Sequence, residues 1–395
     1  MGEADQQPAG LKLSVMGLES GEPTTVAEMV TDPRTRRMWW IRVSMYIAFV
    51  IAGQSAATLL GRLYYAKGGN SKWMASLVEC GGFPVLIPLY ILTKKNSPPA
   101  NSNSNSTSHV SLPILTLAYT VMGILIAGFS LLYSVGLMYL PVSTYSLISA
   151  SQLGFNALFS FFINSQKITT YILNSLVLLT LSSILLVFEN PSSSESAQSG
   201  SSRRNFAIGF LSTVGASVGY GLLLTLTEFF FEKVVRRRTF KVVVDVLVYP
   251  PAVASAAVVA GLFGSGEWKG IGKEMEGFEL GKASYVMTLV WTAVCWQVFS
   301  IGCVGLIFEV SSLFSNVIGT FGLPVVPILA VVCFRDEMGG LKVIAMVLAV
   351  WGFVSYLYQH YLDDREDSGS KFESDGGRSS GEGDDQETLG EGLLV

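Results

Sequence analysis

Five polar residues recur along one apolar stretch of the chain at spacings of four, three, four and four. They are Tyr145, Ser149, Gln152, Asn156 and Ser160. Such spacings place all of them on one face of a helix. Since the amides of Gln152 and Asn156 offer both donors and acceptors, this stripe could bind the edge of a flat heterocycle or bond to a neighbouring helix. For the stripe as a unit we favour the wall of a ligand cavity.

Other apolar stretches carry further candidates for ligand contact, namely Asn316, Trp291, Gln54 and Tyr220. Trp291 could stack on a planar base, because it lies nine residues past Lys282 and is therefore too deep for an interfacial anchor. Trp296 and Gln297 follow in the same stretch. The amides and rings together favour a ligand that is flat, polar at its edge and uncharged.

Glu79 is an acid within an otherwise apolar stretch. A bare carboxylate in the hydrocarbon costs on the order of 3 kcal/mol, and a proton-coupled carrier needs a group that can take up and release a proton. Glu79 is thus our first candidate for proton coupling. The alternatives are an ion pair with Arg62 or a shallow position, since Lys72 is only seven residues away. Glu309 is a reserve candidate that could instead favour the positive N-terminus of the following helix.

These residues lie in ten stretches that are long and apolar enough to cross a bilayer. Between His109 and Lys167, 57 consecutive residues lack Asp, Glu, Lys and Arg. At about 1.5 Å per helical residue, this run suffices for two crossings of ~30 Å, and Pro141 should separate them. Charges bound seven of the other spans, at 42–62, 72–94, 167–189, 204–228, 245–267, 282–309 and 342–363, and the ninth span runs from Val310 to Phe334. The sequence predicts an all-α, polytopic membrane protein.

Composition narrows the function classes further. Half of the residues are hydrophobic and 14% are charged, which is typical of a membrane protein. Of the two histidines, His109 lies outside the spans and His360 lies at the very end of the tenth, and the four cysteines have no metal-ligand spacing. We therefore expect no enzyme, no metal and no cofactor. A carrier of phosphate or carboxylate compounds would need a cation in its cavity, and none occurs in the middle of a span.

Lys and Arg also predict the orientation and the division of the chain. With the N-terminus inside, 16 of the 26 Lys and Arg fall in cytoplasmic segments, which indicates cytoplasmic termini. We expect a disordered tail at 1–41, a first repeat of five helices at 42–188, an external Ser-rich loop at 189–205, a second repeat at 206–361 and an acidic tail at 362–395.

A weak internal repeat indicates how the two sets of five spans are related. A shift of 168 residues lays Val142 on Val310, Gly154 on Gly322 and Lys167 on Arg335. Because five is an odd number, the second set enters the membrane upside down. Inverted repeats are typical of secondary transporters, whose substrates bind near the midplane where the repeats meet. A channel would not require them.

Several longer motifs resemble the plant purine permeases. They are LGRLYY at 60–65, GGNSKWM at 68–74, PVSTYSL at 141–147, FEVSSLFSNVI at 308–318 and KVIAM at 342–346, and the resemblance covers residues 38–361. It implies the drug/metabolite transporter fold and proton-driven uptake of purine nucleobases and derivatives such as cytokinins. The partners implied are a small purine-type substrate, protons and the lipid bilayer of the plasma membrane, without nucleic acid. The alternative is a carrier of another small neutral metabolite or an alkaloid.

Overall fold

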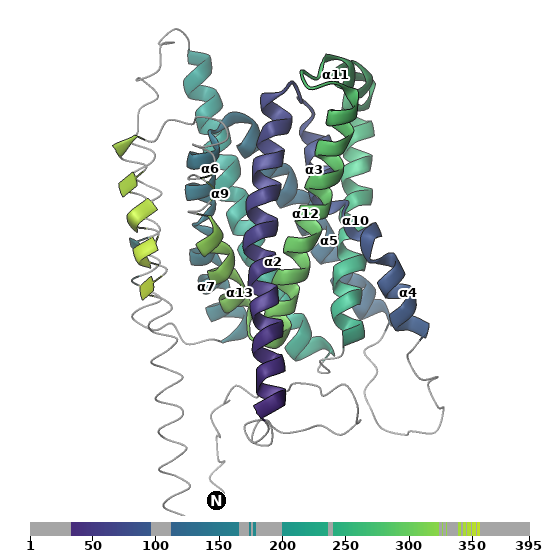
Figure 1. Cartoon of the computed structure of the whole chain (residues 1–395), viewed down its shortest axis with the longest axis vertical. Helices are drawn as coiled ribbons and strands as arrows, with labels where there is room; N and C mark the ends of the chain where they lie inside the picture. The colour runs from purple at the N-terminus through teal and green to yellow at the C-terminus, as the bar shows by residue number, and fades with distance from the viewer. Residues whose placement is uncertain are drawn as a thin grey trace, which may run out of the picture.

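The computed structural model describes residues 33–95, 112–165, 200–235 and 240–323, with isolated residues between 174 and 178 and between 326 and 355. Every element of these ranges is helical (Figure 1). The elements are α2 (Pro33–Ala66), α3 (Lys72–Cys80), η1 (Phe83–Leu86), α4 (Ile87–Lys95), α5 (Leu112–Tyr139), α6 (Val142–Ser149), α7 (Gln152–Asn164), α9 (Gly200–Phe229), η3 (Phe230–Val235), α10 (Phe240–Ser265), η4 (Glu267–Gly270), α11 (Ile271–Gly277), α12 (Lys282–Glu309) and α13 (Ser312–Gly322).

Within the described residues, seven helical segments are long and apolar enough to cross a membrane. They correspond to the first four expected spans and to the sixth, seventh and eighth. The ninth is described as α13 up to Leu323, whereas the fifth and most of the tenth lie outside the described residues. The prediction of an all-α polytopic membrane protein is confirmed, and the described helices are compatible with ten spans.

Several boundaries differ from the sequence prediction. Helix α2 begins at Pro33, inside the segment expected to be a disordered tail, and α9 begins at Gly200, inside the expected external loop. The break at Pro141 occurs as expected, because α5 ends at Tyr139 and α6 begins at Val142. The remaining parts of both expected tails, 1–32 and 362–395, lie outside the described residues.

The second span is two short helices that meet near the middle of the bundle. Helix α3 ends at Cys80, and Gly81, Gly82 and Pro84 follow. Pro84 cannot donate a hydrogen bond to the Cys80 carbonyl. A Cβ on Gly82 would lie 2.6 Å from the carbonyl oxygen of Ala293 on α12. This interruption brings the chain close to α12 directly after Glu79.

The fourth span is also interrupted, so the polar stripe is divided between two helices. Helix α6 ends at Ser149 and α7 begins at Gln152. Between them the chain forms a tight turn, with hydrogen bonds from Ser151 N to Ile148 O (3.0 Å) and from Gly154 N to Ser151 O (3.0 Å). Tyr145 and Ser149 therefore belong to one helix, and Gln152 and the rest of the stripe to another.

The contacts between helices are compatible with an inverted repeat. Suppose that α2, α3, α5 and α7 of the first half correspond to α9, α10, α12 and α13 of the second half. Replacing each helix of a contacting pair by its equivalent then gives another pair of helices. The pair α2–α12 matches α5–α9, α7–α9 matches α13–α2, and α5–α10 matches α12–α3. All six pairs are in contact. The two halves are therefore interleaved in space rather than side by side.

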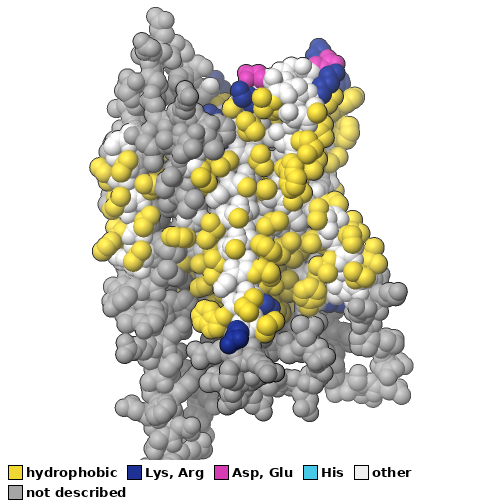
Figure 2. Space-filling model, viewed as in Figure 1, with side chains coloured by type: hydrophobic (Ala, Val, Ile, Leu, Met, Phe, Trp, Pro, Cys, Tyr) yellow, Lys and Arg dark blue, Asp and Glu magenta, His cyan; other side chains and the backbone are white. Residues whose placement is uncertain are grey.

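Apolar side chains cover the flanks of the bundle, and charges gather at its two ends (Figure 2). Leu112 and Leu117 on α5 and Leu211 on α9 are examples of highly exposed leucines, at 79%, 64% and 69%. The end that carries η4 and α11 also carries ion pairs, such as Lys67 with Glu279 (2.8 Å) (Figure 1). This distribution matches a hydrocarbon belt between two aqueous faces.

Candidate functional site

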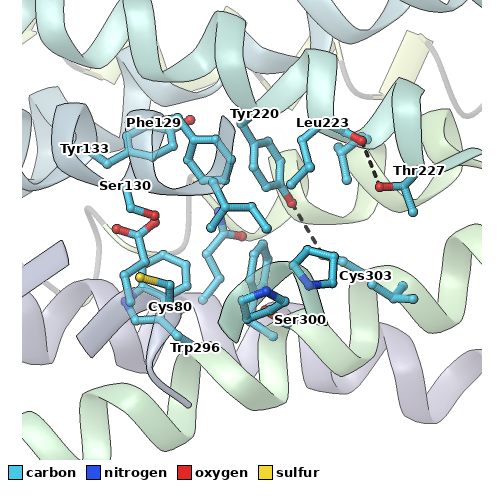
Figure 3. Close-up of a pocket in the computed structure, with 18 of the residues that line it drawn as sticks. Cys80, Phe129, Ser130, Tyr133, Tyr220, Leu223, Thr227, Trp296, Ser300 and Cys303 are labelled. Atoms are coloured by element: carbon cyan, nitrogen blue, oxygen red, sulfur yellow. Dashed lines mark hydrogen bonds between the residues drawn. The ribbon is translucent and has the colours of Figure 1, made fainter. Parts of the chain in front are cut away.

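A cavity of about 120 Å³ lies between the helices, where the two halves meet. Its walls come from α2, α3, α5, α6, α7, α9, α10 and α12 (Figure 3). Its polar or titratable lining residues are Gln54, Thr58, Glu79, Cys80, Ser130, Tyr133, Tyr145, Ser149, Gln152, Tyr220, Thr227, Gln297, Ser300 and Cys303. The remaining walls are aliphatic or aromatic, as is usual for a small-molecule site.

Three glutamines on three different helices line this cavity: Gln54 on α2, Gln152 on α7 and Gln297 on α12. Each is at most 6% exposed. The atoms Gln54 Oε1, Gln152 Nε2 and Gln297 Nε2 have no hydrogen-bond partner among the described residues. Because an unpaired buried polar atom costs about 1 to 3 kcal/mol, the set is suited to a ligand that offers complementary donors and acceptors.

Contacts between helices hold Gln152 in position. The hydroxyl of Tyr133 donates to Gln152 Oε1 (3.2 Å), and Asn316 Nδ2 on α13 donates to the backbone oxygen of Gln152 (3.1 Å). A Cβ on Gly221 of α9 would lie 3.1 Å from the same backbone oxygen. The free end of the Gln152 amide is therefore presented to the cavity from a fixed backbone.

Aromatic rings from α5, α9 and α12 line the cavity. Tyr220 and Phe299 lie nearly parallel, with ring centres 6.3 Å apart and planes at 27°. Trp296 meets Phe299 edge to face at 5.4 Å, and Phe129 meets Tyr220 in the same manner at 5.7 Å (Figure 3). Rings that line the cavity beside unpaired amide atoms suit a flat heterocycle, which stacks on one surface and is hydrogen-bonded at its edge.

Glu79 lines the cavity in the last turn of α3, beside the hydroxyl of Ser130. No Lys or Arg among the described residues forms an ion pair with it. Arg62, considered as its partner from sequence, donates instead to the backbone oxygen of Leu137 (3.3 Å). Within the part of the chain that the structure describes, Glu79 is therefore an acid that faces the cavity without an ion-pair partner.

Two adjacent prolines of α10, Pro250 and Pro251, supply a further polar feature. In an α-helix the backbone N–H of residues 250 and 251 would donate to the carbonyls of Val246 and Leu247. Because proline has no backbone N–H, these two carbonyls lack their usual donors. All four residues line the cavity. Interrupted or proline-containing helices at corresponding places of two repeats are characteristic of transporter binding sites, and here the second and seventh spans both have this property.

The structure places Asn156 and Asn316 between helices rather than in the lining of the cavity. Asn156 Oδ1 accepts from Thr225 Oγ1 (2.9 Å), and Asn156 Nδ2 donates to the backbone oxygen of Ser312 (3.4 Å). Asn316 forms the reciprocal bond to Gln152 O described above. Both amides therefore join α7 to α13 in this conformation. The C-terminal part of the polar stripe, from Asn156 to Ser160, contacts α9.

Trp291 and Glu309 also lie away from the cavity lining. Trp291 is 53% exposed on the outer surface of α12. Trp296, on the same helix, lines the cavity instead. Glu309 ends α12 and forms an ion pair with Arg42 on α2 (Glu309 Oε1 to Arg42 Nε, 3.0 Å). Neither residue is placed to contact a ligand in the cavity, whereas Gln54, Gln152, Tyr220 and Glu79 are.

The sequence pattern did not single out Tyr133 and Ser130, and it offered Glu228 only as a fallback group for proton coupling. Tyr133 and Ser130 lie on the cavity face of α5, and Glu228 is buried at the end of α9. There Glu228 accepts hydrogen bonds from Ser312 Oγ (2.7 Å) and Asn164 Nδ2 (2.7 Å). The spacing of Ser130 and Tyr133 within an otherwise apolar helix could have revealed them. From the sequence alone, Glu228 could not be distinguished from a charge that marks the end of a membrane span.

The fold and the site define a class: a multi-pass helical membrane protein with a central cavity between interleaved halves, in which no Lys or Arg of the described residues takes part. Comparison with known proteins agrees. Residues 41–366 match a family described as purine nucleobase transmembrane transport. Purine permease 21 of Arabidopsis thaliana is 54% identical over 345 residues, covering 87% of this chain and 86% of that protein. Probable purine permease 6 and probable purine permease 10 of the same plant are 52% and 55% identical, over 88% and 82% of this chain and 89% and 82% of those proteins. The chain belongs to the purine permease family.

Proposed function

We propose that this protein is a secondary active transporter that takes up purine nucleobases and purine derivatives such as cytokinins together with protons. The observation that carries the proposal is the cavity between the two halves, with one unpaired amide atom on each of three glutamines, aromatic walls and an acid that forms no ion pair among the described residues. Family membership supports a purine-type substrate.

The polar edge of a neutral purine is the complement of this lining. Purines carry ring nitrogens that accept hydrogen bonds and exocyclic or ring N–H groups that donate them. Gln54, Gln152 and Gln297 can bind such an edge, and Tyr220 or Trp296 can stack on its face. The aliphatic walls from Leu223, Leu224, Val304 and Ile307 leave room for an apolar substituent.

Another small neutral metabolite or an alkaloid is the alternative substrate. Among the described residues no Lys or Arg lines the cavity, which disfavours phosphorylated compounds and carboxylates. The alternative differs from a purine in the hydrogen bonds that its edge can form. Competition between labelled adenine and a panel of neutral heterocycles would distinguish a purine carrier from a carrier of another neutral compound.

Proton coupling follows from the charge of the substrate. A membrane potential cannot concentrate a neutral base, so an ion must move with it, and Glu79 is the cavity group best suited to carry a proton. With both termini in the cytoplasm, the ends of α2 and α12 that carry Arg42 and Glu309 face inward. The loops that contain Lys67 and Glu279 then face outward from the plasma membrane.

Uptake of radiolabelled adenine and of a cytokinin into proteoliposomes, with and without a pH gradient, tests the proposal. We expect saturable uptake that rises when the outside is acidic. Failure to transport any purine would refute the substrate assignment. Saturable uptake that does not depend on the pH gradient would support the substrate assignment and reject proton coupling.

The variant Glu79→Gln tests the coupling group. Glutamine keeps the shape of the side chain and cannot exchange a proton, so we expect exchange of adenine across the membrane to persist while accumulation driven by the gradient is lost. Glu276→Gln is the matched control, because this acid is exposed and pairs with Lys282 at the surface (3.0 Å). Normal accumulation by Glu79→Gln would move the coupling role to Glu309, Glu228 or Asp245.

A further inference from the structure

A second, smaller cavity of about 30 Å³ adjoins the main one. We call it the outer chamber. The two cavities share walls formed by Glu79, Tyr133, Tyr145 and Trp296. Since a water molecule needs roughly 10 to 15 Å³ of such space, the outer chamber is large enough for water and too small for a bicyclic base.

The other side of the outer chamber reaches an aqueous face of the bundle. Tyr64 lines the chamber, and its hydroxyl contacts the carboxylate of Glu274 on α11. Tyr285 donates to the same carboxylate oxygen (3.1 Å). Glu274 is half-buried at the end of the bundle that also carries the loop between α2 and α3 (Figure 1). A single tyrosine ring therefore lies between the chamber and a surface acid.

Hydroxyl groups line the interval between this surface acid and Glu79. Tyr65 and Ser134 both line the chamber, and the buried Tyr65 hydroxyl has no hydrogen-bond partner among the described residues, so it is free to bind a water there. Ser76 Oγ donates to Ser134 Oγ (3.0 Å). Hydroxyl groups can accept a hydrogen bond on one side while donating on the other, which is the property that a proton relay requires.

We propose that the outer chamber holds water and, with Tyr64, Tyr65 and Ser134, conducts protons between Glu274 at the surface and Glu79 in the substrate cavity. This inference rests on the proposed function, in which Glu79 takes up the coupling proton. Each hydroxyl or water accepts one proton and releases another, so no net charge stays on the route. Glu79 ends as a neutral carboxylic acid, and the water at the surface has lost one proton. Substrate does not need this route.

Two variants interrupt the relay in different ways. Tyr65→Phe removes a hydroxyl and keeps the ring, whereas Ser134→Leu removes a hydroxyl and fills the chamber. Gly128→Leu is the matched control on the same helix as Ser134, because a side chain there would meet nothing within 4 Å. The probe is radiolabelled adenine in proteoliposomes, measured both as uptake driven by a pH gradient and as adenine exchange at equal pH.

We expect each relay variant to lower the initial rate of gradient-driven uptake by about tenfold or more, as for loss of a positioned proton-transfer group. Exchange at equal pH needs no net proton movement and should stay within about twofold of wild type. The control should be unchanged in both assays. Retained exchange also demonstrates that a variant has folded and inserted, and Tyr65→Phe decides the matter if Ser134→Leu does not fold.

Two results would overturn the relay. If the wild type responds to the gradient and both variants respond equally well, protons reach Glu79 by another route. If exchange falls in parallel with driven uptake in folded variants, the chamber is part of the substrate path. A wild type that transports adenine without responding to the gradient would instead refute the coupling itself, and the relay with it.

Discussion

Gln152 illustrates how this protein places an unpaired amide inside a membrane. Its backbone oxygen is held by Asn316 and its side-chain oxygen by Tyr133, so only the Nε2 end is free for a ligand. A polar atom without a partner is costly in hydrocarbon. We infer that the cost is offset when substrate binds, which makes these unpaired atoms the selective part of the site.

Replacing Gln152 with leucine should therefore weaken substrate binding more than folding. Loss of one buried polar contact costs about 1 to 3 kcal/mol, so the half-saturation concentration for adenine uptake should rise about 5- to 150-fold. Thr116→Val on α5 is the control, since Thr116 is exposed and bonds only its own helix at Leu112 O (2.9 Å). Unchanged half-saturation in correctly inserted Gln152→Leu would exclude this amide from recognition.

The two tryptophans of α12 allow a test of base stacking. Trp296 lines the cavity, whereas Trp291 faces outward. If Trp296 stacks on the substrate, Trp296→Ala should cost about 1 to 3 kcal/mol of binding, seen as a rise in half-saturation concentration for adenine. Trp291→Ala should leave it within about twofold. The reverse ranking would place the ligand on the opposite face of α12.

Glycines set the distance between the longest helices. Helix α2 packs on α12, and a Cβ on Gly53 would lie 2.7 Å from the backbone nitrogen of Phe299 and 2.9 Å from the backbone oxygen of Cys295. Backbone atoms cannot rotate out of the way as a side chain can. Close approach of backbones at small residues is a main source of helix association in lipid, and here it also positions Gln54 one residue farther along α2.

Gly53→Ala should consequently destabilise the folded protein. Overpacking typically costs about 1 to 3 kcal/mol, so the melting temperature of the protein in detergent should fall, together with its monodisperse fraction in size-exclusion chromatography. Gly128→Ala provides the comparison, because its Cβ would meet no atom within 4 Å and alanine is favoured over glycine in a helix by roughly 0.5 to 1 kcal/mol. Equal melting temperatures for the two variants would contradict the close-packing interpretation.

At the scale of the whole molecule, loops of the two halves are fastened together at one end of the bundle. Glu279 N donates to Lys67 O (3.1 Å), and the side chains of the same residues form an ion pair (2.8 Å). Ser71 Oγ donates to Glu267 Oε2 nearby (2.7 Å). Alternating access requires the halves to move relative to each other, and these contacts must separate if this end is to open.

Cross-linking this end should therefore stop transport. With cysteines at positions 67 and 279 and serines at the native cysteines, a short thiol-specific cross-linker should abolish adenine uptake, and uptake should return when a cleavable linker is reduced. Either single cysteine variant, treated identically, should remain active. Full transport by the cross-linked double variant would show that this end does not open during the cycle.

Much about this protein was determined by the sequence alone. Long uncharged runs must form helices in lipid, because every backbone group has to be paired within its own segment. This requirement predicts the all-α fold, the break at Pro141 and the depth of Gln54, Gln152, Tyr220 and Glu79. Motifs such as GGNSKWM at 68–74 indicated the purine permeases, and the comparisons confirmed that membership.

Only the tertiary structure decided which side of each helix faces the cavity. Apolar surroundings are alike in lipid and in a protein core, so periodicity cannot tell Trp291, which faces outward, from Trp296, which faces the cavity. The close approach of Gly82 to α12 likewise depends on a residue far away in the chain, Ala293. Asn156 bonds a neighbouring helix because α9 and α13 approach it. Such choices depend on contacts between residues far apart in the chain, and no local spacing encodes them.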